Sequence, residues 1–138
     1  MLKTLNGKLS QEQIWERNQM VRTYFKLQEL RDQKEEAQAK YDKLISNYNL
    51  DEMSLEEEIE LEENLNFETG IISINNKVSK QEERVINKLL DFIDKLEETK
   101  KQELDVEYLR ENWKYHIKAR KKLIKTAEAI ATAEVIEL

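Results

Sequence analysis

The chain contains no proline, and this absence constrains its fold more than any other feature of the sequence. Average composition would give a chain of this length about seven prolines and about ten glycines. Its only glycines are Gly7 and Gly70. Because the two residues that most often interrupt a helix are nearly missing, the backbone can continue as helix over long stretches. The sequence therefore predicts an all-α fold.

The balance of charged and apolar residues narrows this prediction. Charged residues make up 38% of the chain. Leu, Ile, Val and Phe make up 27%, which exceeds the ~20% below which so charged a chain is expected to stay disordered. These side chains can line stripes but cannot fill the core of a sandwich, a barrel or a doubly wound sheet. We expect long amphipathic helices, packed as an antiparallel helical hairpin or coiled-coil-like bundle with a short acidic central segment, in one domain over residues 1–138.

A first helix is predicted over about residues 11–48. Ser10 and Gln13 form a capping-box pattern at its start, and Asn47 and Asn49 supply a stop. Seven of nine heptad positions along it are apolar, which predicts contact with another helix. These positions, here called the heptad stripe, are Met20, Thr23, Leu27, Leu30, Lys34, Ala37, Tyr41, Leu44 and Tyr48.

An acidic helix or loop is predicted over about residues 54–76. Ser54 and Glu57 form a second capping box at its start. From Asn64 to Asn76 two interpretations stay open. The favoured one is a helix that ends at Gly70, and the other is a small β-hairpin.

The C-terminal part predicts helices over about residues 79–98 and 104–136. Ser79 and Glu82 form a third capping box. One continuous helix also fits, but a bend near residues 99–103 is preferred because residues 97–103 contain no apolar side chain. The predicted buried stripe comprises Val85, Ile86, Leu89, Phe92, Ile93, Leu96, Val106, Leu109, Trp113, Ile117, Leu123, Ile124, Ala127, Ile130 and Ala131.

The net charge of −6 is distributed unevenly along the chain. Residues 44–76 contain nine acidic side chains and no basic one. Residues 112–127 contain Lys and Arg but no acidic side chain. This separation predicts either neutralisation of one segment by the other or two recognition surfaces.

The acidic segment is the first candidate recognition surface. Acids without intervening bases repel one another, and a purely structural helix avoids this cost by interspersed lysines. We expect the segment to bind a basic groove on a partner protein, with apolar anchors beside the charges. The alternative is a solvated helix face that binds no partner. The candidate residues are Glu57, Glu58, Glu62 and Glu63, with Leu55, Ile59, Leu61 and Phe67 as anchors.

A basic stripe is the second candidate surface. Its members lie three or four residues apart, so one helix over 104–136 would place them on one face, where they could track a phosphate backbone. A solvated face, or one docked on the acidic segment, is the alternative. The candidate nucleic-acid-binding residues are Arg110, Lys114, Lys118, Lys121 and Lys125.

The sequence lacks the residue types that several kinds of catalytic and covalent chemistry require. The chain has no cysteine and one histidine, His116, so disulfides, thiolate chemistry and a nucleophile–base pair are not available. We expect no enzymatic activity, no metal site and no cofactor. No apolar run is long enough for a signal peptide or a membrane span, so we expect a cytoplasmic protein that does not bind membranes.

The order of a helix, a short central segment and a second helix resembles that of prefoldin-type coiled-coil chaperones. The stretch from Gln81 to Leu89 is also similar to part of a helix in that family. The family has a longer spacer before this stretch and no counterpart of the C-terminal residues. The sequence therefore assigns no family.

These patterns together predict a non-enzymatic helical protein-interaction module that acts through its acidic surface. A small regulator, inhibitor or assembly factor has this form, for example an accessory protein of a phage or mobile element. A protein partner is expected, and we expect either a dimer or stable association with a partner helix, because thin stripes bury little surface in a chain of this size. The alternative function is nucleic-acid binding through the basic stripe.

Overall fold

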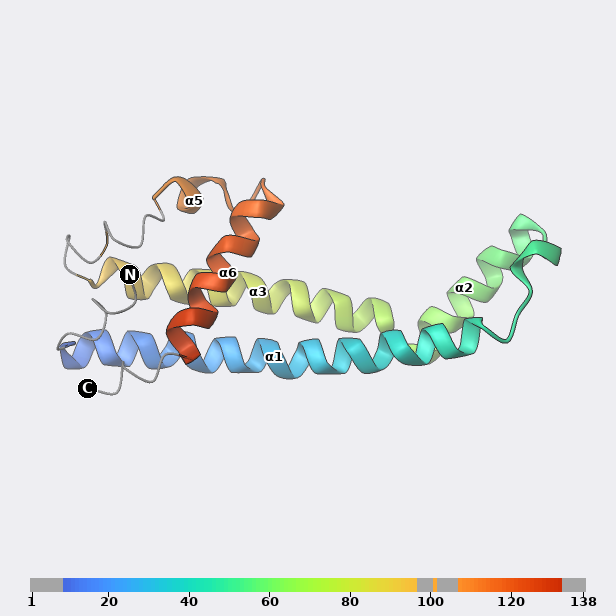
Figure 1. Ribbon diagram of the computed structural model, residues 1–138, viewed down its shortest axis with the longest axis horizontal. Helices are drawn as coiled ribbons and strands as arrows, with labels where there is room; N and C mark the ends of the chain where they lie inside the picture. The colour runs from blue at the N-terminus through green and yellow to red at the C-terminus, as the bar shows by residue number, and fades with distance from the viewer. Residues whose placement is uncertain (1–8, 97–100, 102–106, 133–138) are drawn as a thin grey trace. The chain divides into compact units, whose positions relative to one another are not determined.

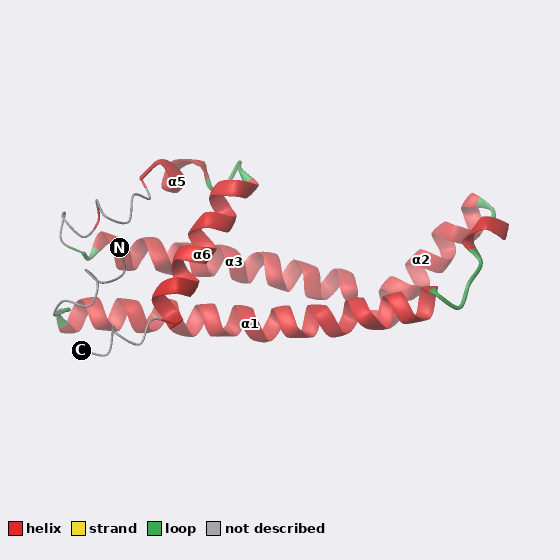
Figure 2. Cartoon of the chain, viewed as in Figure 1, coloured by secondary structure: helices red, strands yellow, loops and turns green. Residues whose placement is uncertain are grey.

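The computed structural model describes residues 9–96, 101 and 107–132, and over these residues its regular elements are all helices, joined by short turns and loops (Figure 2). The predicted all-α class is confirmed for this part of the chain, which has five α-helices, one 3-10 helix and no strand. The elements in order are α1 (Gln11–Ile45), the 3-10 helix η2 (Leu50–Glu52), α2 (Leu55–Thr69), α3 (Ile71–Asp94), α5 (Glu107–Asn112) and α6 (Ile117–Thr132) (Figure 1).

The chain folds into two compact units. The first unit comprises Met1–Leu27 and Gln81–Leu138, and the second comprises Gln28–Lys80. Helices α1 and α3 each contribute residues to both units, whereas α6 belongs to the first and α2 to the second. The single domain expected over residues 1–138 stays a prediction.

In the first unit, α1 and α3 pack against each other in opposite directions. The Gln13 Nε2 atom donates to the Lys95 carbonyl oxygen at 2.8 Å, and the Gln81 Nε2 atom donates to the Thr23 carbonyl oxygen at 3.0 Å. The Lys95 Nζ atom also lies 2.9 Å from Glu12 Oε1, a hydrogen-bonded ion pair that raises the pKa of Lys95. The start of α1 thus meets the end of α3, which confirms the antiparallel arrangement.

The core of the first unit confirms the apolar stripe predicted on α3. All six of its members from Val85 to Leu96 are buried. Helix α6 adds a buried face, and Arg120 joins α6 to α3 through Glu82. The buried side chains that α6 contributes are Ala119, Leu123, Ile124, Ala127 and Ile130.

The heptad stripe predicted on α1 matches the structure only in its first half. Met20, Leu27 and Leu30 are buried, but Tyr48 lies beyond the end of the helix and is 49% exposed. Tyr24, which lies outside the stripe, is buried. The first half of α1 therefore buries a face that is broader than the two heptad positions of the stripe, as is typical of a helix in a globular core.

Two of the three predicted capping boxes are present. Ser10 and Gln13 exchange hydrogen bonds of 2.8 and 3.1 Å, and α1 begins at Gln11, directly after Ser10. Ser54 and Glu57 exchange bonds of 3.4 and 3.2 Å at the start of α2. Each box satisfies backbone N–H groups that have no partner within the helix.

The predicted helix start at Ser79 is wrong, because α3 begins at Ile71 and contains Ser79 in its interior. Ile71, Ile74 and Val78 are buried at spacings of three and four residues. This apolar face extends the stripe of α3 back to the start of the helix. Its burial outweighs the weaker preference of Ser79 for a helix end.

Gly70 separates α2 from α3, which confirms the interpretation of a helix end and excludes the β-hairpin. Its φ of 67° lies in the left-handed region, and its N–H group donates to the Asn66 carbonyl oxygen at 2.9 Å. The Ile74 N–H group in turn donates to the Gly70 carbonyl oxygen at 3.0 Å. The acidic helix therefore ends at Thr69, and residues 71–76 of the predicted acidic segment belong to α3.

We expect Gly70→Ala to lower the free energy of unfolding by about 1 kcal/mol, because a side chain disfavours left-handed backbone. No atom lies within 4 Å of a Cβ added at this position, so the backbone alone sets the cost. Gly70→Asn should lose less, since asparagine tolerates this conformation. Urea denaturation followed by circular dichroism measures both, and a greater loss for Asn than for Ala would contradict the explanation.

The helix predicted over residues 104–136 is interrupted in the structure, because α5 ends at Asn112 and α6 begins at Ile117. Trp113 and Ala119 are both buried, yet six residues of continuous helix would turn them about 120° apart. The intervening turn brings both side chains inward. It leaves Ile117, a predicted member of the buried stripe, 73% exposed.

A continuous helix from about residue 79 to the C-terminus is excluded, since α3 ends at Asp94. The bend predicted near residues 99–103 falls, apart from Lys101, outside the described residues, as does Val106.

Candidate interaction surfaces

Helix α2 turns one side toward the interior of the second unit. Leu61 and Leu65 are only 7% and 3% exposed. Leu61 was predicted as an anchor for a partner, and this prediction is wrong because the side chain is already packed. The helix begins with Glu56, Glu57 and Glu58 in its first turn, where carboxylates interact favourably with the helix dipole.

The other side of α2 bears three large apolar side chains that the second unit leaves exposed. Leu55 is 71%, Ile59 48% and Phe67 92% exposed. Together with Glu63 they follow one another at intervals of four residues, and each step turns by about 40° around the helix. They therefore form a continuous, slowly winding row, here called the α2 ridge.

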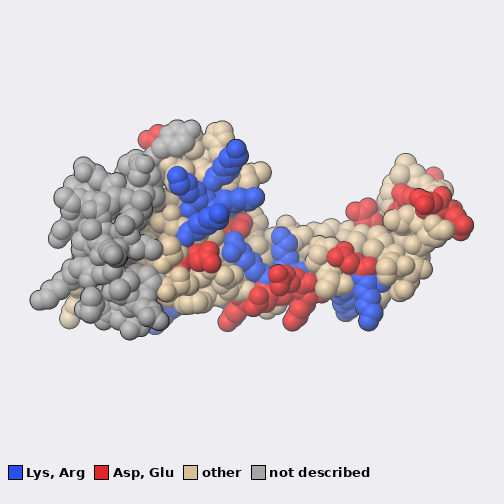
Figure 3. Space-filling view, in the orientation of Figure 1, with Lys and Arg blue, Asp and Glu red and all other residues tan. Residues whose placement is uncertain are grey.

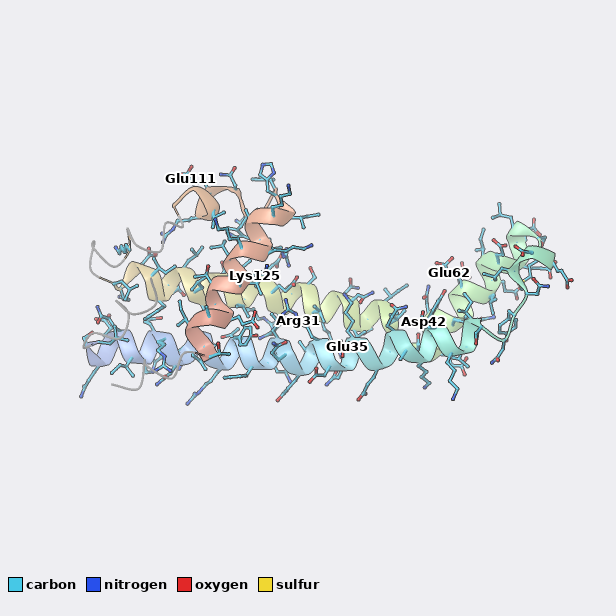
Figure 4. The ribbon with its side chains drawn as sticks, in the orientation of Figure 1. Arg31, Glu35, Asp42, Glu62, Glu111 and Lys125 are labelled. Atoms are coloured by element: carbon cyan, nitrogen blue, oxygen red, sulfur yellow. The ribbon has the colours of Figure 1, made fainter. Side chains whose placement is uncertain are left out.

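Carboxylates gather on α2 beside the apolar members of the ridge (Figure 3). Glu57, Glu62 and Glu63 are exposed and Glu58 is half-buried, and α2 contains no basic residue. Burial raises the pKa of the Tyr41 phenol, and the nearby carboxylates of Glu62 on α2 and Asp42 on α1 raise it further (Figure 4). The structure thus leaves three of the four predicted anchors exposed on the helix that carries the predicted acids.

One exposed apolar residue of the second unit escaped the sequence analysis. Ile72 on α3 is 55% exposed, while its neighbour Ile71 is buried. Adjacent residues lie about 100° apart on a helix, so only one of the pair can face the core. The placement of the helix start at Ser79 concealed this signal.

The predicted basic stripe does not form one helical face, because its residues lie on three different elements. Arg110 on α5 forms an ion pair with Asp94, with 2.7 Å between Nη1 and Oδ1. Lys114 lies in the turn after α5, with its Nζ atom 5.8 Å from the centre of the Trp113 ring. Only Lys118, Lys121 and Lys125 lie on α6. The prediction that these five residues share one helical face is wrong, because it assumed an unbroken helix.

Helix α6 nevertheless has a basic surface of its own (Figure 3). Lys118, Lys121, Lys122 and Lys125 are all exposed and form what is here called the α6 patch; Figure 4 labels Lys125 on this helix. Arg120 is half-buried and differs from these lysines, since its guanidinium pairs with Glu82 at 3.3 Å and with Glu83 at 3.9 Å. The predicted basic stripe did not include Lys122, because on an unbroken helix Lys122 would lie on a different face from Arg110.

A cavity of about 280 Å³ lies between α5 and the start of α6. Its walls are mostly apolar, and Lys118, Lys122 and His116 are among the residues that line it. His116 itself is exposed. Two residues of the α6 patch thus border this hollow.

Within the described ranges, no group of three or more His, Asp or Glu side chains is placed to hold a metal ion. In the same residues, no helix combines the length and the apolar content that crossing a bilayer requires. No protein-family model, curated protein or solved structure matches the chain. The described part of the chain is all-α, with the α2 ridge and its neighbouring acids on one helix and the basic α6 patch on another.

Proposed function

We propose that the protein is a non-enzymatic interaction module that binds a partner protein through the α2 ridge. It acts as a small regulator, inhibitor or assembly factor. The observation that supports this function best is the combination of Leu55, Ile59 and Phe67, exposed in one row, with seven acids and no base on the same helix.

The apolar members of the ridge supply the binding energy. Exposed clusters of large apolar side chains are typical of interaction sites rather than of free surfaces. Full burial of Phe67 or Leu55 in a partner pocket contributes about 1.5–3 kcal/mol each. Such anchors usually lie near the centre of an interface and account for most of its affinity.

The acids select the partner. The second unit has fourteen acidic and six basic side chains, whereas the first unit has fifteen and seventeen. The negative field of the second unit speeds encounters with a positively charged surface and opposes encounters with a negatively charged one. The complementary partner has a basic groove with apolar pockets, and a groove that otherwise holds nucleic acid has this chemistry.

Replacement of Phe67 by Ala should lower the affinity for the partner at least tenfold, because an anchor loses about 1.5–3 kcal/mol of burial. Glu62→Gln/Glu63→Gln should slow association severalfold and weaken its dependence on salt. Affinity capture from the native host identifies the partner, and surface plasmon resonance at several salt concentrations then measures the variants. Glu57 is left unchanged because it caps the helix.

The matched control is Glu35→Gln/Glu36→Gln, which removes the same charge from two adjacent exposed acids of α1. It should leave the association rate within twofold of the original. If the partner binds all three variants equally well while circular dichroism shows an unchanged helix content, the ridge is a solvated surface and the proposal is wrong. A second copy as the partner is distinguished by sedimentation equilibrium, where the monomer has a mass of 16.6 kDa.

A further inference from the structure

We propose that the α6 patch binds the phosphate backbone of nucleic acid without sequence preference. This inference goes beyond the interaction of α2 with a protein, because it uses a different helix in the other compact unit. It depends on three features of the first unit: the arrangement of the lysines, their lack of neutralisation and the exposed tyrosine beside them.

The four lysines lie within eight residues of α6 and point to one side. At 100° per residue, Lys118, Lys121, Lys122 and Lys125 occupy an arc of about 100°. The buried residues of α6, among them Leu123 and Ala127, occupy the opposite side. The core of the first unit therefore holds the helix so that all four ammonium groups face outward together.

The positive charge of the patch is not neutralised by neighbouring acids. The acids of α3 that approach α6, Glu82 and Glu83, pair with Arg120. No ion pair within the described part of the chain involves any lysine of the patch. Glu128, the only acidic residue of α6, lies three residues after Lys125 and forms no ion pair with it.

The dimensions of the patch match a sugar–phosphate chain. Lys118 and Lys125 are separated by about 10 Å along the helix axis, and one strand of a duplex carries a charge every ~3.4 Å along its axis. The patch therefore spans about three phosphate spacings, which is room for four phosphates of one strand. Tyr115, just before α6, is 84% exposed, and its ring can stack on an unpaired base next to the bound backbone.

The packing of α6 favours nucleic acid over a lipid surface. An amphipathic helix binds a bilayer by inserting its apolar face between the lipids. The apolar face of α6 is already packed in the first unit, where Leu123, Ala127 and Ile130 are fully buried. Apart from Ile117 at its first residue, α6 leaves only its charged face available, and this face suits a ligand whose charge lies on its outside.

The test is fluorescence anisotropy of a short labelled single strand, and of the duplex of the same sequence, titrated with the full chain. Four lysine–phosphate contacts predict that affinity for the single strand falls about 50-fold between about 50 and about 200 mM salt. Lys121→Gln/Lys125→Gln should reduce the affinity at low salt at least fivefold and roughly halve the slope with salt. Tyr115→Ala should weaken single-strand binding and leave duplex binding unchanged.

The control is Lys34→Gln/Lys40→Gln, which removes the same charge from exposed positions of α1 and should change the affinity less than twofold. Equal losses in the two lysine variants, or no saturable binding at low salt, would overturn the proposal. So would tighter binding to vesicles of anionic phospholipid than to either nucleic acid. Glu62→Gln/Glu63→Gln on α2 should not weaken nucleic-acid binding, which keeps this test separate from that of the α2 ridge.

Discussion

Truncation of Phe92 to alanine is expected to lower the free energy of unfolding by about 3–5 kcal/mol, whereas Phe67→Ala should change it by less than about 0.5 kcal/mol. The two variants remove the same atoms from opposite environments. Phe92 is completely buried in the first unit, and Phe67 is 92% exposed on α2. The first variant loses apolar burial and leaves a cavity, while the second loses neither.

Urea denaturation measures both variants if two signals are recorded. The two tryptophans, Trp15 and Trp113, belong to the first unit, so their fluorescence follows the unfolding of the region around Phe92. Circular dichroism follows the helices of both units. A loss for Phe67→Ala as large as that for Phe92→Ala would show that Phe67 is packed in the folded chain. It would then no longer be available to the partner that α2 is proposed to bind.

The parts of the fold that the sequence predicts are those in which local and tertiary preferences agree. The stripe from Val85 to Leu96 is apolar at helical spacing and lies far from any competing signal, and all of it is buried. The capping boxes at Ser10 and Ser54 also stand immediately before helices. In each case one assignment satisfies both the backbone and the core.

Where the two preferences conflict, the sequence misleads. Ser79 has the pattern of a helix start, but the apolar face that includes Ile74 and Val78 requires the helix to continue through it. The break between α5 and α6 is the opposite case. No proline or glycine marks it, and the interruption allows both Trp113 and Ala119 to be buried.

The candidate surfaces were predictable in charge but not in shape. The segregation of acids from bases is visible in the sequence, and the structure leaves most of the acids of α2 and all the lysines of α6 exposed. The sequence did not indicate which leucines of α2 stay exposed for a partner, since Leu55 and Leu61 are equally apolar. Leu55 is exposed and Leu61 is buried because the second unit covers only one side of the helix.

Gln81 provides the last prediction, because it is the only buried polar residue in the described part of the chain. Its Nε2 atom donates to the Thr23 carbonyl oxygen at 3.0 Å, and its Oε1 atom accepts from Arg84 Nη1 at 3.1 Å. The amide thereby links α3 to α1 at one fixed position. A shift between the helices would leave this buried donor without a partner, which costs about 1–3 kcal/mol.

We expect Gln81→Glu to lower the free energy of unfolding by about 1–3 kcal/mol at neutral pH, because an ionised carboxylate cannot donate to the Thr23 carbonyl oxygen and repels it. Burial and this carbonyl raise the pKa of the introduced carboxyl in the folded state above its unfolded value of about 4.3, although Arg84 offsets part of the shift. The loss is therefore complete above the folded pKa. It shrinks as the pH falls toward the unfolded pKa, where the protonated acid can donate again.

Gln81→Met is the matched control, since it keeps the length of the side chain and removes both hydrogen bonds without adding a charge. Its cost, about 1 kcal/mol, should not change with pH. Urea titrations of both variants between neutral pH and about pH 4 measure the difference. If the two variants lose the same stability at every pH, the bond to Thr23 is not what holds α3 in position on α1. The apolar stripe from Val85 to Leu96 would then set the register of the two helices by itself.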